Sequence, residues 1–311
     1  MSDPGINGIL NISKEAGYTS FDVVAVARGV YRQKKCGHTG TLDPMATGVL
    51  PVAFGKATKV CGMITDWDKE YIAELLLGRT TDTLDITGSI TGGDEKLAMS
   101  LDEADVKDAV MGFLGESYQV PPMYSALKVD GRRLYDIARS GGSVERSMRS
   151  VNIRRIEIMD INLPVVKFKV LCSKGTYIRS LCDDIGKKLL CGGCMQSLVR
   201  SMVGPFTLDE AATLSDIKKL RDEGDEEGLR KLLVPVEKVF SFLPGVRVKG
   251  ASEKLLSNGN KLFSEDLEED IKADIKISQK QKFRVYHADG VFAAVYEYDP
   301  STGIMKPDKM F

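Results

Sequence analysis

The chain has 311 residues, 43% hydrophobic and 28% charged, which is ample for a sizeable core and exceeds the usual size of one domain. The formal net charge is −1, so no overall basic excess indicates a nucleic-acid or membrane partner, and an anionic ligand would have to meet a local basic patch. No leader of basic and then apolar residues and no bilayer-spanning apolar run is visible, so we expect a cytoplasmic protein without a membrane partner.

The first half of the chain predicts strands and helices in alternation. Strands are expected at 8–12, 49–55 and 70–78, and helices at 19–33 and 100–115. Ser20 is the expected N-cap of the first helix, and Ser100 with Glu103 forms the expected capping box of the second. Pro51 lacks an N–H group, which predicts that its strand lies at a sheet edge or carries a bulge.

The second half predicts more strands and ends in a β-rich segment. The expected elements are two strands within 150–172 around a turn at Asn162 and Pro164, a helix at 176–190, helices within 209–233, and a hairpin at 282–299 around Asp289 and Gly290. The composition changes after "SFLPG" (241–245). We therefore expect a mixed α+β domain at 1–243 and a small β-rich domain at 244–311.

Charge is concentrated in one segment. Its basic residues are Lys128, Arg132, Arg133, Arg139, Arg146, Arg149, Arg154 and Arg155, opposed only by Asp130, Asp136 and Glu145. Tyr124 and Tyr135 alternate with these cations. Arginines that contact phosphates and aromatic rings that contact bases are typical of an RNA-facing surface. A solvated helix face has the same composition, so the segment by itself leaves both interpretations open.

Motifs for metals and nucleotide cofactors are weak or missing. "GKAT" (55–58) does not match a phosphate loop, because Gly48 lies too far upstream for the four-residue spacer and Ala57 replaces the required Ser or Thr. No G-x-G-x-x-G is present. Cys191 and Cys194 form one C-x-x-C, with no second pair at zinc-site spacing, and the only histidines are His38 and His287. We favour the interpretation that these two cysteines are small buried residues near a turn over a metal or redox site. We expect no metal and no cofactor.

One carboxylate stands in an unusual setting. In "GHTGTLDP" (37–44), Asp43 follows a Gly- and Thr-rich turn and precedes Pro44, which restricts it to extended conformations. A carboxylate can attack an electrophilic carbon if a cation keeps it ionised and the backbone lets a substrate approach. From spacing alone a turn is favoured, because Asp before Pro is a common turn device.

Five long blocks of the sequence form one recognisable set. They are "GHTGTLDPMATGVLPVAFGKATK" (37–59), "KEYIAELLLGRTTDTLDITG" (69–88), "PPMYSALKVDGRRLYDIARSG" (121–141), "CSKGTYIRSLCDDIG" (172–186) and "SLVRSMVGPF" (197–206). These blocks closely resemble the TruB family of tRNA pseudouridine synthases. They stand in the order of the family and span most of the chain before residue 243. Several long blocks in one order are a specific signal.

The resemblance implies roles for individual residues. Asp43 matches the nucleophile, Tyr71 the tyrosine that stacks on the flipped base, and Arg179 the arginine that pairs with the catalytic carboxylate. Substrate contacts are implied for His38, Gly40, Lys14, Leu198, Tyr124, Lys128 and Arg132. The chain departs from the family's Asp-Lys-Pro at Ser13 and Glu15, on either side of Lys14.

The resemblance also implies a fold and a reaction. The fold is a pseudouridine synthase domain with a mixed, mainly antiparallel sheet flanked by helices, followed by a small β-barrel domain of PUA type. The reaction is isomerisation of uridine 55 in the T arm of tRNA by base flipping, with attack of Asp43 on C1′ or C6 left open. The basic insertion at about 121–150 would clamp the arm, and the C-terminal domain would touch the acceptor stem.

Two rival functions are weighed against this expectation. A tRNA-binding folding helper would need the RNA-binding surface but not Asp43, and intact Asp43, Tyr71 and Arg179 argue against it. The guide-RNA-dependent branch of the superfamily is disfavoured because long lysine-rich tails are missing. We therefore expect a monomeric enzyme that acts on tRNA without a guide RNA.

Overall fold

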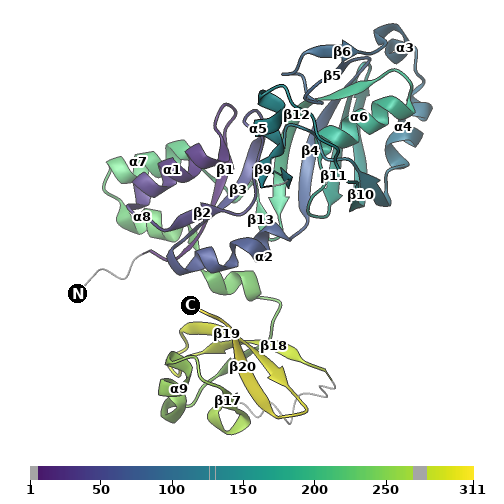
Figure 1. Cartoon of the computed structure of the whole chain (residues 1–311). Helices are drawn as coiled ribbons and strands as arrows, with labels where there is room; N and C mark the ends of the chain where they lie inside the picture. Colours follow the sequence, from purple (N-terminus) through teal and green to yellow (C-terminus); the bar gives the residue numbers. More distant parts are fainter. Residues whose placement is uncertain (1–5, 126, 130, 269–278) are drawn as a thin grey trace. The chain divides into compact units, whose positions relative to one another are not determined.

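The computed structural model describes residues 6–125, 127–129, 131–268 and 279–311 (Figure 1). The chain divides into two compact units. The larger comprises Leu10–Val52 and Cys61–Leu232, and the smaller comprises Ala53–Val60, Leu233–Phe311 and the N-terminal residues through Ile9. Within the described ranges, no helix is both long and apolar enough to cross a membrane. A domain boundary between residues 243 and 244 stays a prediction.

A long mixed sheet forms the centre of the larger unit. Its described strands run in the order β14 (Ala212–Thr213), β1 (Gly8–Lys14), β3 (Thr47–Phe54), β12 (Gly193–Val203), β4 (Lys69–Leu77), β11 (Val165–Cys172), β10 (Arg149–Asn162) and β7 (Gly115–Gln119). Three short strands pair beside this path: β2 (Cys36–His38) with β3, β13 (Phe206–Thr207) with β12, and β15 (Leu233–Val234) with β1.

Most neighbours in this sheet are antiparallel. β12, β4, β11, β10 and β7 form an unbroken antiparallel run, whereas β3 pairs with β12 in parallel and β14 pairs with β1 in parallel. The pairing of β4 with both β11 and β12 makes β4 a central strand, buried on alternate residues. The expected α+β fold with a mixed, mainly antiparallel sheet is confirmed.

Helices cover the sheet and two small ribbons lie beside it (Figure 1). The helices of this unit are α1 (Ser20–Tyr31), α2 (Cys61–Thr65), α3 (Glu95–Met99), α4 (Glu103–Met111), α5 (Leu134–Arg139), α6 (Ile178–Lys188), α7 (Leu214–Asp222) and α8 (Glu226–Lys231). The ribbons are β5 (Thr80–Thr81) with β6 (Ile90–Gly92), and β8 (Lys128–Val129) with β9 (Arg132–Arg133). α6 packs on β12 and β4, and α1 packs on β2 and α7.

Both predicted helix caps are wrong. Thr19, not Ser20, caps α1: its hydroxyl accepts from the Asp22 backbone N–H, and the Asp22 carboxylate accepts from the Thr19 N–H. α4 begins after Asp102, while Ser100 is the C-cap of the short helix α3. The sequence pattern missed α3 because this helix is only five residues long.

The prediction for Pro51 is also wrong in part. β3 lies between β1 and β12 and is therefore not an edge strand. Its pairing with β12 is limited to Thr47 and Gly48, and at Pro51 the carbonyl accepts a hydrogen bond from Thr39. Proline fits an interior strand here because the ladder with β12 has already ended.

The smaller unit contains a second, five-stranded sheet. Its order is β16 (Gly245–Arg247), β18 (Gln281–Tyr286), β19 (Phe292–Asp299), β20 (Ile304–Met310) and β17 (Leu262–Phe263), with helix α9 (Glu253–Ser257) beside it. The predicted hairpin is confirmed, because β18 and β19 pair antiparallel around Asp289 and Gly290. Buried residues such as Val248, Leu256 and Phe283 form a hydrophobic core within this sheet, which fits the expected PUA-like domain.

Candidate active site

The loop that carries Asp43 is anchored on both sides of this residue. Leu42 is buried, and its backbone N–H donates to the Ser20 hydroxyl over 2.9 Å. On the other side, the Pro44 carbonyl accepts hydrogen bonds from Lys14 Nζ at 2.8 Å and from the Gly17 N–H at 3.0 Å. The backbone of Asp43 is therefore held between the end of β1 and the start of α1.

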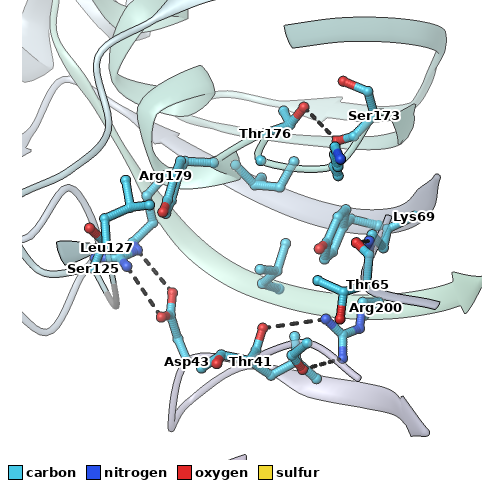
Figure 2. Close-up of a pocket in the computed structure, with 18 of the residues that line it drawn as sticks. Thr41, Asp43, Thr65, Lys69, Ser125, Leu127, Ser173, Thr176, Arg179 and Arg200 are labelled. Carbon is cyan, nitrogen blue, oxygen red and sulfur yellow. Dashed lines mark hydrogen bonds and ion pairs between the residues drawn. The ribbon is translucent and has the colours of Figure 1, made fainter. Parts of the chain in front are cut away.

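The Asp43 carboxylate forms a two-point ion pair with Arg179. Arg179 Nε lies 2.9 Å from Oδ2, and Nη2 lies 3.2 Å from Oδ1 (Figure 2). The same guanidinium donates to the carbonyl oxygens of Thr83 at 3.0 Å and Tyr124 at 2.8 Å. Arg179 stands in the first turn of α6 and is 5% exposed, so its position is set by two backbone carbonyls and the Asp43 carboxylate, on three other segments of the chain.

A second carboxylate lies behind this pair. Asp85 Oδ2 is 3.9 Å from Arg179 Nη1, and Asp85 also accepts hydrogen bonds from the Thr83 and Thr87 hydroxyls. Burial raises the pKa of Asp43, the Arg179 guanidinium lowers it, and the negative charge of Asp85 raises it again. The net direction is a raised pKa, while 37% of the Asp43 side chain stays exposed toward the cavity.

Asp43 lines a cavity of about 550 Å³ in the larger unit. A volume of this order is typical of a ligand pocket. Tyr71 and Leu198 line it from the neighbouring strands β4 and β12, Arg179 from α6, and Gly40 from the loop before Asp43. The structure thus brings together five of the residues that the sequence assigned to the site.

Tyr71 and Leu198 present a ring and an apolar chain to this cavity. Burial raises the pKa of the Tyr71 hydroxyl, and the charge of Arg200 and a hydrogen bond with it oppose that rise. Leu198 is 8% exposed. Gly40 has φ +149°, and a Cβ atom there would be strained although the nearest atom, on Arg200, is 3.8 Å away. These surfaces suit a flat ring.

His38 lies beside the cavity lining rather than in it. It stands on β2, half-buried, and its Nδ1 accepts a hydrogen bond from the Gly40 N–H at 3.3 Å. The exposed ring of Phe21 packs edge-on against it, with ring centroids 5.4 Å apart. Burial and the charge of Arg200 lower the pKa of His38, so the neutral imidazole is favoured. His38 and Phe21 together offer an apolar surface next to the loop.

Lys14 differs from its expected place among the substrate contacts. Its residue exposure is 0%, and Nζ donates to the carbonyl oxygens of Glu15, Tyr18 and Pro44 at 2.7–2.9 Å. Burial lowers its pKa to about 8. With no exposed surface in this structure, Lys14 contacts the Asp43 loop from behind, because two carbonyls of the short connection into α1 and the carbonyl of Pro44 need a donor.

The basic insertion contributes unevenly to the site. The Tyr124 side chain is not in the cavity lining, although its carbonyl holds Arg179. Arg132 is exposed on β9, and Lys128 lies on β8 with its side chain outside the described atoms. Arg149, which the sequence assigned only to the basic segment, is exposed and lines the cavity.

The sequence interpretation missed several polar residues at the site, and three of them are charged side chains that are at most 15% exposed. They are Asp85, Arg200 and Lys69. A signal for Arg200 existed: it stands two residues after Leu198 in a strand, and alternate residues share one face. Lys69 gave the same signal, because it stands two residues before Tyr71 in β4. Asp85 gave none, because its position depends on how separate segments meet.

The two cysteines of the C-x-x-C are buried free thiols. Cys191 is 1% and Cys194 0% exposed, and burial raises the pKa of both. Among the described residues, no group of three or more His, Cys, Asp or Glu side chains is arranged to hold a metal ion.

Comparison with solved structures places this arrangement in a known class. The chain is similar to a chain in the structure of an H/ACA RNP bound to a substrate RNA containing 2′-deoxyuridine (TM-score 0.71, 26% identity, 98% of this chain and 84% of that one). A chain in a Cbf5-Nop10-Gar1 complex is also similar (TM-score 0.68, 29% identity, 94% of this chain and 78% of that one). The fold is that of the pseudouridine synthases, and the arginine-paired aspartate lies in its cavity.

Sequence comparison defines the family. Residues 28–178 match the model of the TruB family pseudouridylate synthase N-terminal domain, and residues 179–241 match that of the tRNA pseudouridylate synthase B C-terminal domain. The chain is 45% identical over 315 aligned residues to tRNA pseudouridine synthase B of Lachnoclostridium phytofermentans, covering 98% of this chain and all of that protein. It is 47% identical to the Alkaliphilus oremlandii protein of the same name, covering 83% of this chain and 84% of that protein. The chain belongs to the TruB family of pseudouridine synthases.

Proposed function

We propose that this chain isomerises uridine 55 in the T arm of tRNA to pseudouridine, with Asp43 as the nucleophile. The observation that carries the proposal is the Asp43 carboxylate, held by Arg179 and facing a cavity of about 550 Å³ that Tyr71 also lines. Relatives that match nearly the whole chain are named tRNA pseudouridine synthase B, which supports tRNA as the substrate.

The reaction rearranges bonds within the substrate and adds or removes no atoms overall. The N1–C1′ bond breaks, the uracil turns in the cavity, a C5–C1′ bond forms, and the C5 proton is exchanged for a proton on N1. Asp43 forms a temporary bond to the substrate and is released unchanged, which splits one difficult step into two. No redox change or external group is required, so we expect activity without an added cofactor.

The protein contributes position and charge to this reaction. The target uridine must leave its stack, at a cost of a few kcal/mol, and a ring stacked on Tyr71 would offset part of that cost. Arg179 favours the ionised carboxylate before attack. His38 and the exposed Phe21 beside it offer a surface for neighbouring loop nucleotides.

We further propose that the enzyme acts as a cytoplasmic monomer without a guide RNA. The basic segment 121–150 would contact the phosphates of the T arm, and the PUA-like unit would contact the acceptor stem. The full-length match to relatives named for a tRNA substrate supports this choice over guide-directed action.

Replacing Asp43 tests the proposal directly. The purified chain alone, incubated with an unmodified tRNA transcript, should convert uridine 55, mapped at nucleotide resolution. Asp43→Asn should lower the single-turnover rate by about 10⁴-fold or more while tRNA binding changes little. Asp222→Asn, at an exposed carboxylate on α7, is the matched control and should leave the rate unchanged.

Other outcomes would contradict specific parts of the proposal. A normal rate in Asp43→Asn would remove the nucleophile assignment. Tight tRNA binding with no pseudouridine from the wild-type chain would favour the folding-helper alternative, and activity only after addition of a second RNA would favour guide-directed action.

A further inference from the structure

Arg200 is a fully buried arginine that lines the same cavity as Asp43 and Tyr71. It is 2% exposed and stands on β12, directly opposite Tyr71 on β4. On its other side Arg200 pairs with Gly48 of β3, where a Cβ atom would lie 2.2 Å from the Arg200 carbonyl oxygen. Only glycine permits this close approach, so the backbone of Arg200 is fixed between two strands.

The guanidinium reaches from this strand to the loop before the nucleophile. Nε donates to the Val49 carbonyl at 2.7 Å, Nη1 to the Thr41 carbonyl at 3.4 Å and Nη2 to the Gly40 carbonyl at 3.3 Å. In Figure 2 Arg179 meets the carboxylate of Asp43 while Arg200 meets the backbone at Thr41, two residues earlier in the same loop. The two arginines therefore hold the loop at two points.

Arg200 also lies against Tyr71, the group proposed to stack on the flipped base. Arg200 stands directly opposite Tyr71 across the β12–β4 pair, where its charge and hydrogen bonding oppose the rise in the pKa of the Tyr71 hydroxyl. Among the described residues, the partners of this guanidinium are carbonyl oxygens and a phenol rather than a carboxylate. A buried cation without a carboxylate is costly in free energy unless its hydrogen bonds are satisfied, so a purely structural role would be better filled by an apolar side chain.

We propose that Arg200 is a positioning residue that ties the Tyr71 hydroxyl to the backbone leading into Asp43, so that both groups face the target uridine in fixed places. The inference rests on the proposed function, because Asp43 and Tyr71 are its reacting and stacking groups. The rigid fork of the guanidinium suits this task, since one planar group can reach two carbonyls and a phenol at once.

Two variants of Arg200 distinguish a positioning role from a role in packing alone. Arg200→Met keeps much of the length and removes the donors, and Arg200→Lys keeps a charge but not the fork. The matched control is Arg284→Met, a half-buried arginine of the smaller unit whose guanidinium donates to the Leu243 carbonyl and pairs with Glu237. Thermal midpoints of all variants establish that each one is folded.

The first measurement uses the ligand-free protein. Tyrosine is labelled with ¹³C at Cζ, and the Tyr71 signal is identified by its loss in Tyr71→Phe. It should shift in Arg200→Met, shift less in Arg200→Lys, and stay in place in Arg284→Met. An unchanged signal in Arg200→Met would overturn the proposed contact whatever the enzyme's substrate is.

The second measurement is the single-turnover rate on an unmodified tRNA transcript, with the Kd for tRNA measured in parallel. Arg200→Met should lower the rate by about 10²-fold, with Kd changed by less than about threefold, because misplaced groups slow the chemical step. Arg200→Lys should recover part of the rate. A loss confined to Kd, or a normal rate in the folded variant, would overturn the proposal. Absence of pseudouridine with the wild-type chain would instead refute the proposed function.

Discussion

At the scale of single residues, the site depends on buried charges and their immediate partners. Arg179 joins two carboxylates and two carbonyls, and Arg200 joins three carbonyls and a phenol. Both guanidiniums are nearly inaccessible, so their hydrogen bonds are made in low dielectric, where they are stronger and a missing partner is more costly. The polar network therefore determines where Asp43 and Tyr71 stand.

Replacing Arg179 should shift the acidic side of the pH–rate profile. Burial raises the pKa of Asp43 and Arg179 opposes this, so Arg179→Lys, which loses the two-point contact, should raise that pKa further. A carboxyl with a higher pKa takes up its proton earlier as pH falls. The single-turnover rate should therefore decline at higher pH than in the wild type, with a loss of about 10²-fold at neutral pH.

The measurement is the rate from about pH 5 to about pH 8 for the wild type and two variants. Arg221→Lys, at an exposed arginine on α7, is the control and should reproduce the wild-type profile. If Arg179→Lys lowers the rate equally at every pH, Asp43 is not the group whose ionisation limits the reaction.

At the scale of elements, each strand or helix brings one or two side chains to a common point. β4 supplies Tyr71, β12 supplies Leu198 and Arg200 from one face, and the first turn of α6 supplies Arg179. The loop between β2 and β3 supplies Asp43 and is anchored to β1 and α1. The basic insertion forms the ribbon β8–β9 and helix α5 beside this site.

The exposed cations of the basic insertion predict how tRNA binding depends on salt concentration. Arg132 is exposed on β9, and a cation that contacts an RNA phosphate releases a counterion on binding. Arg132→Gln should weaken tRNA binding and reduce the slope of log K against log salt concentration by about one. Fluorescence or filter binding over a salt series measures this slope.

The matched control is Lys231→Gln on α8, where the exposed amine pairs with Glu227. It should leave the slope as in the wild type. If Arg132→Gln also leaves the slope unchanged, Arg132 does not face the RNA, and the solvated-face interpretation of this segment is favoured.

At the scale of the whole molecule, the chain forms two units from interleaved segments. The larger unit contains all residues of the candidate site, and the smaller contains a separate hydrophobic core around its five-stranded sheet. The larger unit also buries Lys14 and Lys69, which are 0% and 7% exposed. Two buried amines make the stability of this unit depend on pH.

Lys69 provides a test of that dependence. Burial lowers its pKa from 10.5 to about 8, so the unfolded chain binds more protons than the folded one between these values. The contribution of Lys69 to the free energy of unfolding should therefore rise as pH increases through this window. The wild type should gain stability relative to Lys69→Met between about pH 8 and about pH 10.

Urea unfolding followed by Trp67, the single tryptophan, reports on the larger unit. The difference between wild type and Lys69→Met is the relevant quantity, because buried tyrosines and cysteines titrate in the opposite direction at high pH. Lys219→Met, at an exposed lysine, is the control and should show a constant difference. A constant difference for Lys69→Met as well would mean that its amine is not desolvated.

The sequence alone determined the features that depend on neighbours along the chain. Alternating and helical patterns located most strands and helices, the turn at Asp289 and Gly290 located a hairpin, and the block around Asp43 identified the family. It erred at Ser20, Ser100 and Pro51, because helix ends and sheet edges depend on contacts outside the local window.

Only the tertiary structure decided how distant residues meet. Asp43 and Arg179 are 136 positions apart, and Arg200 contacts Gly40 across 160. Family resemblance pointed to the first pair, whereas nothing in the local pattern placed Arg200 against Tyr71 or Asp85 against Arg179. Such contacts follow from strand order and register, because a shift of one residue in β12 would turn Arg200 and Leu198 together away from the face that lines the cavity.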